Sequence, residues 1–152
     1  MSNPANEEAA AAIRTHHVEL NEYLRARVAA LCDAVRTGTD HTSVRDAVIA
    51  YLDEELLPHA AAEETTLYPA GDTGITAMLV RAMRDEHRDL AGRVGELREM
   101  TDALGAATRA SAILALFESH LSKENDLLIP ALVANPDVSL GDLLSGMHEL
   151  VG

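Results

Sequence analysis

The sequence is poor in the residues on which several common structural classes depend. It contains one cysteine, no tryptophan, one phenylalanine and three tyrosines in 152 residues. A single cysteine excludes an internal disulfide and any paired-cysteine zinc or redox motif, and Cys32, in an apolar stretch, is expected to be a small core residue. Because 47% of the residues are hydrophobic but only 3% are aromatic, packed helices are favoured over a β-rich fold.

Basic residues and long apolar runs are scarce as well. Twelve Lys and Arg residues stand against 25 Asp and Glu residues, and the net charge of −13 argues against a nucleic-acid partner. No apolar run approaches the roughly 20 residues that a membrane-spanning helix needs. The N-terminal residues MSNPANEEAA include no hydrophobic segment, so the sequence predicts no signal peptide and a cytoplasmic location.

Apolar residues recur at three- and four-residue steps along four long stretches, which is typical of amphipathic helices. Gly38 and Gly105 are expected to end the first and third helices, and Ser43 and Ser139 to cap the second and the last. The expected helices span about residues 10–36, 43 up to Pro69, 75–104 and 108–134, followed by a short helix after Ser139.

Short linkers between these helices predict an all-α fold, an up-down-up-down four-helix bundle with a short extra C-terminal helix. It would form one domain, residues 10–152, after a flexible tail of residues 1–9. Pro58 cannot donate to the carbonyl of Glu54, so a kink is expected just before His59. Pro130 is expected to kink or fray the end of the fourth helix.

Two stretches, one in the second helix and one in the fourth, follow the same pattern. HAAAEETTLYP (His59–Pro69) and HLSKENDLLIP (His120–Pro130) both read His-x3-Glu-x5-Pro, and every element is displaced by 61 positions. His17 and His87, 70 positions apart, each begin a His-x2-Leu segment. The chain therefore contains a twofold pseudo-repeat of a helix pair.

Residues four apart lie on one face of a helix, so each His-x3-Glu unit presents an imidazole and a carboxylate side by side. One histidine of each long helix falls on its apolar stripe, where a buried imidazole needs a polar partner. Buried carboxylates also need a cation or close partners. A shared metal would satisfy the whole set, which is His17, His59, Glu63, His87, His120 and Glu124.

Two other interpretations of this set of polar residues are possible. The imidazoles and carboxylates could form a hydrogen-bonded network without metal, or Glu63 and Glu124 could be surface charges on frayed helices. His16 adjoins His17 about 100° round the helix, and the phase of the apolar stripe favours His17 as the inward residue.

Three further polar residues of the second helix lie near its inner face or just off it. Tyr51 and Glu55 lie at its edge, upstream of His59, and could be extra metal ligands or outer partners of the ligands. Glu64 falls off the apolar stripe and is expected to lie in solvent.

Imidazole and carboxylate ligands without thiolates suit iron, manganese or zinc. Four imidazoles and two carboxylates are too many for one ion that keeps an open position. They fit two iron ions bridged by Glu63, by Glu124 and by an oxo or hydroxo group, each ion with five ligands and a vacancy.

With this ordered set, the chain resembles the hemerythrin-like, or HHE cation-binding, family over nearly its whole length. Classical oxygen carriers of that family have His-x3-His on the third helix, where this sequence has Ala91, and His-x4-Asp on the fourth, where it has His120-x3-Glu124. The resemblance is closer to the bacterial proteins with the H–HxxxE–H–HxxxE pattern. The missing imidazole leaves a coordination position that is open or filled by water, Tyr51 or another side chain.

The resemblance implies a non-haem di-iron protein that binds or reduces O2, H2O2 or NO in oxidative or nitrosative stress. Consumption of peroxide or NO is one expectation for its activity. The rival is an iron- or oxygen-sensing or storage module without turnover, and a third reading is a metal-free helical scaffold. The sequence pattern does not indicate a protein partner.

Overall fold

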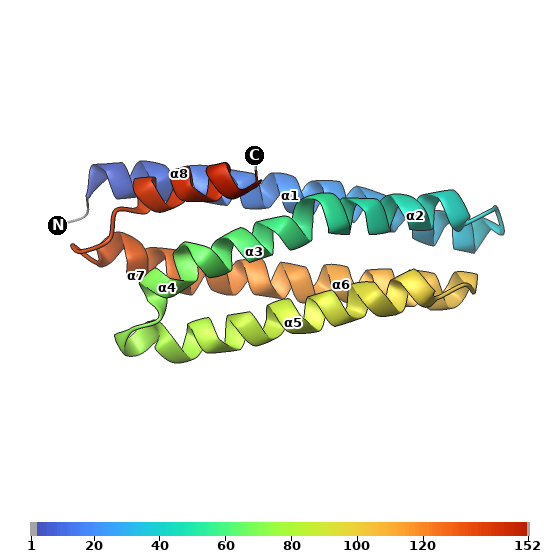
Figure 1. The fold of residues 1–152 in the computed structure, drawn as a ribbon. Helices are drawn as coiled ribbons and strands as arrows, with labels where there is room; N and C mark the ends of the chain where they lie inside the picture. The colour runs from blue at the N-terminus through green and yellow to red at the C-terminus, as the bar shows by residue number, and fades with distance from the viewer. Residues whose placement is uncertain (1–2, 152) are drawn as a thin grey trace.

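The computed structural model describes residues 3–151, which form four long helical rods and a short helix along one side (Figure 1). This confirms the expected all-helical bundle. The first rod is α1 (Pro4–Thr37). The second consists of α2 (Thr42–Tyr51), the π-helical turn η1 (Leu52–Leu56), α3 (Leu57–Thr65) and α4 (Leu67–Gly71). The third is the 3-10 turn η2 (Gly74–Thr76) with α5 (Ala77–Glu99), and the fourth is α6 (Ala103–Lys123), the π-helical turn η3 (Glu124–Leu128) and α7 (Ile129–Ala134).

The C-terminal helix α8 (Leu140–Val151) packs against α1 and α3 (Figure 1). The hydroxyl of Ser139 accepts a hydrogen bond from the amide of Asp142, which is the cap expected there. Other helix ends differ from expectation. Helix α2 begins at Thr42 without a side-chain cap from Ser43, and the amide of Thr42 donates to Asp40 instead.

The first helix begins earlier than the sequence suggested. Residues 1–2 of the expected flexible tail lie outside the described residues, and residues 4–9 are the first turns of α1. Asn3 caps the helix, and Asn6 is 2% exposed. The Asn6 side chain donates to the carbonyl of Val138 and accepts from the amide of Leu140. These two bonds tie the start of α1 to the loop before α8.

The turn between the third and fourth rods also lies earlier than expected. Helix α5 ends at Glu99 rather than Leu104, and α6 begins at Ala103 because the carboxylate of Asp102 accepts from the amide of Gly105. Gly105 is therefore inside the first turn of α6 rather than a helix breaker. A Cβ there would lie 2.6 Å from Sδ of Met100, so a larger residue would have to displace the Met100 side chain.

Both prolines that were expected to distort a helix follow a π-helical turn. Pro58 follows η1 and Pro130 follows η3. The amide of Leu57 donates to Leu52 and that of Ile129 to Glu124, five residues back instead of four. The wider turn keeps the chain helical where a proline removes a bond and crowds the preceding carbonyl. A π-helical turn thus stands where a kink was expected before His59. The helix continues past Pro130 to Ala134, without the fraying that was expected there as an alternative to a kink.

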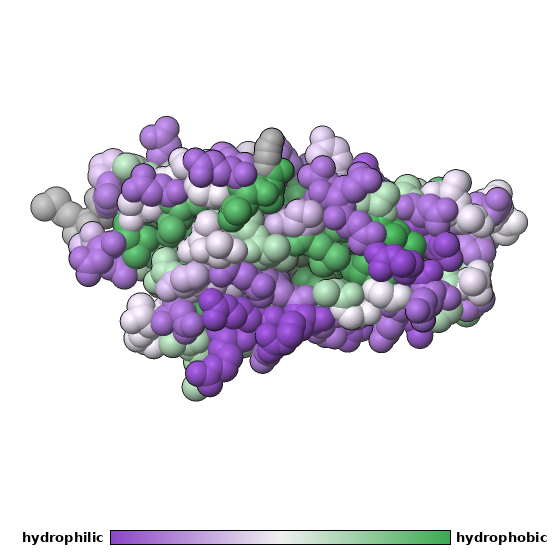
Figure 2. Space-filling model, viewed as in Figure 1, coloured by the Kyte–Doolittle hydropathy of each residue, from purple (hydrophilic) through white to green (hydrophobic). Residues whose placement is uncertain are grey.

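The apolar core is divided into two clusters along the bundle. One cluster includes Leu24 and Leu97, toward the α1–α2 loop, and the other includes Ile13 and Leu132, beside α8. Hydrophilic residues cover most of the face in Figure 2, with apolar residues in a band along its middle. Within residues 3–151, no helix combines the length and apolar character that crossing a bilayer requires.

Candidate metal centre

The polar set predicted from the sequence lies between the two apolar clusters. Its six side chains come from all four rods and are almost completely removed from solvent: His17 1%, His59 5%, Glu63 1%, His87 7%, His120 1% and Glu124 0% exposed. The helical spacing explains this arrangement, because each histidine continues the stripe of core residues on its own helix. Burying so many polar groups is costly unless they share strong partners.

The six side chains form two overlapping groups of possible metal ligands. In each group the four ligand atoms lie within 4.8 Å of one another. Both groups include Glu63 and Glu124. The first position, as we call it, adds His17 and His59, and the second position adds His87 and His120.

At the first position, the imidazole Nε2 atoms face the carboxylates. His17 Nε2 lies 3.1 Å from Oε1 of Glu124 and 3.8 Å from Oε2 of Glu63, and His59 Nε2 lies 3.3 Å from Oε1 of Glu63. The rings of His17 and His59 meet edge to face, with centroids 5.3 Å apart.

At the second position, the two imidazoles are close neighbours. His87 Nε2 and His120 Nε2 are 3.1 Å apart, and His120 Nε2 lies 3.1 Å from Oε2 of Glu124. The hydroxyl of Tyr68 lies 3.0 Å from both of these nitrogens and donates to Oε2 of Glu124 at 3.1 Å. Tyr68 is fully buried, so its oxygen belongs to the same polar cluster.

Several atoms of the cluster are buried without a hydrogen bond among the described residues. Four of them are Nε2 of His17, Nε2 of His59, Oε2 of Glu63 and Oε1 of Glu124, and the other two are Nδ1 of His87 and Nδ1 of His120. Although His17 Nε2 and Glu124 Oε1 are only 3.1 Å apart, they do not meet with hydrogen-bonding geometry. All four atoms belong to the first position and could bind one cation together. The donor set therefore fits a metal better than it fits a closed hydrogen-bond network.

Burial keeps two of the imidazoles, His59 and His87, ready to bind a metal. Burial and the neighbouring His17 lower the pKa of His59 to about 3, and burial and His120 lower the pKa of His87. These rings are therefore neutral at pH 7, the form that coordinates metals. Burial and Glu63 raise the pKa of Tyr68 far above its usual range, so its phenol keeps its proton unless a cation displaces it.

The two carboxylates behave as a pair. Burial and Glu124 raise the pKa of Glu63 well above its ordinary value. Burial also disfavours ionisation of Glu124, but its close contacts with Glu63, His120 and His17 outweigh burial and lower the pKa of Glu124. The two pKa values are thus shifted in opposite directions. A metal would favour ionisation of both.

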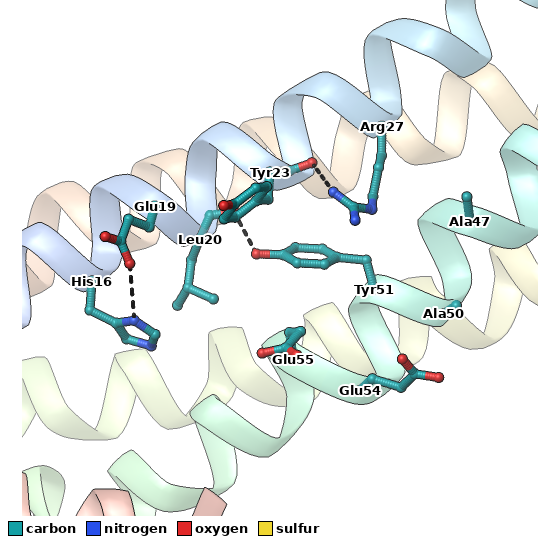
Figure 3. Close-up of a pocket in the computed structure, with 10 residues that line it drawn as sticks. All are labelled: His16, Glu19, Leu20, Tyr23, Arg27, Ala47, Ala50, Tyr51, Glu54 and Glu55. Carbon is teal, nitrogen blue, oxygen red and sulfur yellow. Dashed lines mark hydrogen bonds and ion pairs between the residues drawn. The ribbon is translucent and has the colours of Figure 1, made fainter. Parts of the chain in front are cut away.

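The structure does not bring Tyr51 and Glu55 to this cluster. They line a separate pocket of about 520 Å³ between α1 and the second rod, together with His16, Glu54 and other residues (Figure 3). The Tyr51 hydroxyl donates to the carbonyl of Leu20 at 3.0 Å, on α1. His16 lies on the pocket side of the helix, half exposed, while His17 points inward as the apolar phase predicted.

Sequence reasoning missed Tyr68. It lies nine residues after His59, which on a regular helix is half a turn away from the metal-facing side. The helix is interrupted at Thr66, where φ is −117° and ψ is −74°, and the short helix α4 starts in a new direction. The run of Pro69 and Gly71 after Tyr68 marked the end of a helix, but nothing in the sequence shows how the break redirects the tyrosine.

A family model described as the hemerythrin HHE cation binding domain matches residues 8–132. The matched region contains all six predicted ligands and most of the four rods, from within α1 to within α7. Comparison with curated proteins and with solved structures gives no match.

Proposed function

Because the chain belongs to the family of hemerythrin HHE cation-binding domains, we propose that it is a non-haem di-iron protein that binds or reduces a small oxidant, namely O2, H2O2 or NO. Membership of the family implies metal binding, and the buried His and Glu groups are compatible with it. The identity and number of the ions, the bridging oxo or hydroxo group and the oxidant are parts of the proposal.

The observation that carries the proposal is the sharing of two carboxylates between two ligand groups. Each group has two imidazoles of its own, and both use Glu63 and Glu124. This is the arrangement that two neighbouring ions need if carboxylates bridge them. We therefore propose His17 and His59 as terminal ligands of one ion, and His87 and His120 as terminal ligands of the other.

The chemistry of the donors favours iron. Nitrogen and oxygen ligands without thiolate suit iron, manganese and zinc. Two adjacent iron ions, when the protein holds them, can pass electrons to O2, NO or H2O2. The protein's own residues would hold the pair inside the bundle. The apolar clusters on both sides of the ligands limit the access of bulk water along the bundle.

The extra ligand considered for Tyr51 is better supplied by Tyr68. Its hydroxyl lies 3.0 Å from His87 Nε2 and from His120 Nε2, so we propose that it occupies or adjoins the coordination position left by the missing imidazole. A phenolate ligand would stabilise ferric iron and disfavour reversible binding of O2. This supports reduction of an oxidant over oxygen carriage.

The pattern His17, His59-x3-Glu63, His87, His120-x3-Glu124 supports assignment to the bacterial H–HxxxE–H–HxxxE subgroup. We propose, with that subgroup, a cytoplasmic role in oxidative or nitrosative stress. The rival function is iron or oxygen sensing, or iron storage, without turnover.

The cofactor is tested by elemental analysis of the purified protein together with its visible spectrum in air and under reductant. We expect about two irons per chain and absorption from an oxygen-bridged ferric pair that disappears on reduction. Zinc or manganese in stoichiometric amount, or a protein without metal after purification from iron-supplemented cells, would refute the di-iron assignment.

The function is tested by steady-state consumption of H2O2 and of NO by the iron-loaded protein with a reductant. The variant Glu124→Ala, which lacks a proposed bridging ligand, is the control for iron free in solution. Consumption that depends on Glu124 supports the stress-handling role. A loaded protein that consumes neither molecule, but changes its spectrum reversibly with O2 or iron supply, would favour the sensing or storage role.

A further inference from the structure

The inner ligands of the two ion positions are chemically the same, two imidazoles and two shared carboxylates each. Any difference between the positions must therefore come from Tyr68 and from the groups behind the imidazoles. Those groups matter because an imidazole that binds a metal through Nε2 carries its proton on Nδ1. The partner that accepts this proton sets the orientation and the basicity of the ring.

Carboxylates stand behind both imidazoles of the second position. His87 Nδ1 lies 3.4 Å from Oε1 of Glu64, and His120 Nδ1 lies 3.5 Å from Oε2 of Glu86. Lys123 pairs with Oε1 of Glu86, which leaves Oε2 buried opposite Nδ1 of His120. Neither Nδ1 makes a well-formed hydrogen bond, so a small side-chain movement would complete both.

The imidazoles of the first position have an amide and an imidazole as neighbours instead of carboxylates. His17 Nδ1 lies 2.7 Å from the amide oxygen Oδ1 of Asn125. The ring of His59 packs against the ring of His16, with centroids 5.2 Å apart. The first position therefore has an amide and an imidazole where the second has two carboxylates.

The pseudo-repeat shows that these outer residues are true counterparts. Asn125 lies 61 positions after Glu64, the displacement of the two His-x3-Glu units. Glu86 lies 70 positions after His16, the displacement of the two His-x2-Leu segments. Tyr68 has Ile129 as its counterpart, which offers no oxygen. The two halves thus keep the inner ligands and differ at all three outer positions.

Two cavities open beside the first position. One of about 220 Å³ is lined by His17, Asn125, Asn21 and Glu118, so it reaches a proposed ligand directly. The pocket of about 520 Å³ in Figure 3 is bordered by His16, whose ring covers that of His59. The smaller cavity thus reaches His17 itself, and the larger one reaches His16 beside His59.

We propose that the two ion positions are inequivalent: the second position retains its ion, and the first position exchanges its ion with solvent. The negative charge of Glu64 and Glu86 raises the basicity of His87 and His120 and favours the cation electrostatically. Loss of such an outer partner changes metal affinity by about 10- to 100-fold. This inference rests on the proposed function, since it requires two ions per chain.

The test measures release of iron rather than catalysis. Protein loaded anaerobically with ferrous iron is mixed with a chromogenic chelator in excess, and release is followed in time. We expect two phases of equal amplitude with rate constants at least about tenfold apart. Glu64→Gln, which keeps the side-chain size, should accelerate the slow phase about tenfold or more and leave the fast phase unchanged.

The reciprocal variant Asn125→Asp should slow the fast phase and leave the slow phase unchanged. Asp126→Asn, a charge change on an exposed neighbour, is the matched control and should alter neither phase. Release of two irons in one phase, or acceleration of the fast phase by Glu64→Gln, would overturn the inference while the di-iron assignment stands. Failure of the wild-type chain to bind iron at all would instead remove the proposed function itself.

Discussion

Two tyrosines show how much the role of a residue depends on the backbone that carries it. Tyr51 lies at the edge of the inner face of α2, yet its hydroxyl donates a hydrogen bond to the carbonyl of Leu20 and not to the metal centre. Tyr68 looked like part of a helix end, yet it is fully buried and reaches two imidazoles. The difference comes from the break at Thr66, which re-aims the chain after α3.

Tyr68→Phe and Tyr51→Phe should therefore have different effects on the iron-loaded protein. Phenylalanine fills the same volume but removes the hydroxyl. We expect Tyr68→Phe to abolish any tyrosinate absorption in the visible spectrum and Tyr51→Phe to leave that absorption and the iron content unchanged. A spectrum altered only by Tyr51→Phe would return the ligand role to Tyr51.

Tyr51 also gives the metal-free protein a defined response to alkaline pH. Burial and the nearby Glu55 raise the pKa of Tyr51 to about 12, from an ordinary value of 10.0. Because the folded pKa is the higher one, its stabilising contribution is complete below about pH 10 and is lost between about pH 10 and 12. An absorbance titration of ionised tyrosine should show a late step that Tyr51→Phe removes. Removal of an early step instead would contradict the assignment.

The six inner residues could be predicted from sequence because their spacing follows the helix period and their neighbours are apolar. The outer partners could not be predicted in the same way. Glu64 was expected in solvent, and its carboxylate is indeed partly exposed, yet one oxygen faces His87. Asn125 carried no signal, because an amide beside a charged helix face reads as surface. Contacts between rods depend on packing angles that a single sequence does not encode locally.

At the scale of the elements, glycines and prolines had to be interpreted by context. Pro58 and Pro130 were predicted to disturb their helices because a proline removes a backbone donor, and each follows a π-helical turn. Gly105 was misread, since a glycine that stops one helix looks the same in sequence as a glycine that begins another. Gly71 is a third case, because it allows α4 to approach the side chains of Val80 and Leu128.

Gly71→Ala should destabilise the protein, while Gly92→Ala should not. A Cβ at Gly71 would lie 2.6 Å from Cδ1 of Leu128, which is fully buried, so we expect a cost of about 1–3 kcal/mol for overpacking. A Cβ at Gly92, within α5, meets nothing within 4 Å, and alanine should stabilise the helix by about 0.5–1 kcal/mol. Urea unfolding of the metal-free variants measures both. Equal effects of the two substitutions would show that Gly71 is not tightly packed.

At the scale of the whole molecule, the metal centre and the stability of the bundle are linked. The polar cluster separates the two apolar clusters, so the middle of the bundle has few apolar contacts of its own. The chain also carries a net charge of −13, and cations at its centre reduce the repulsion. Ions that bind only the folded chain stabilise it by mass action, about 4 kcal/mol when free ligand is a thousandfold above Kd.

Removal of metal should therefore lower the melting temperature of the wild-type protein, and Glu63→Gln should abolish that dependence. At about 2–4 °C per kcal/mol for a domain of this size, a chelator should lower the wild-type value by roughly 10 °C. Glutamine keeps the shape of Glu63 and can accept from His59, so the metal-free variant should melt close to the metal-free wild type. What it cannot do is bridge two cations as a carboxylate. If Glu63→Gln still gained stability from iron as the wild type does, Glu63 would not be a shared ligand, and the two positions would have to be held by the imidazoles and Glu124 alone.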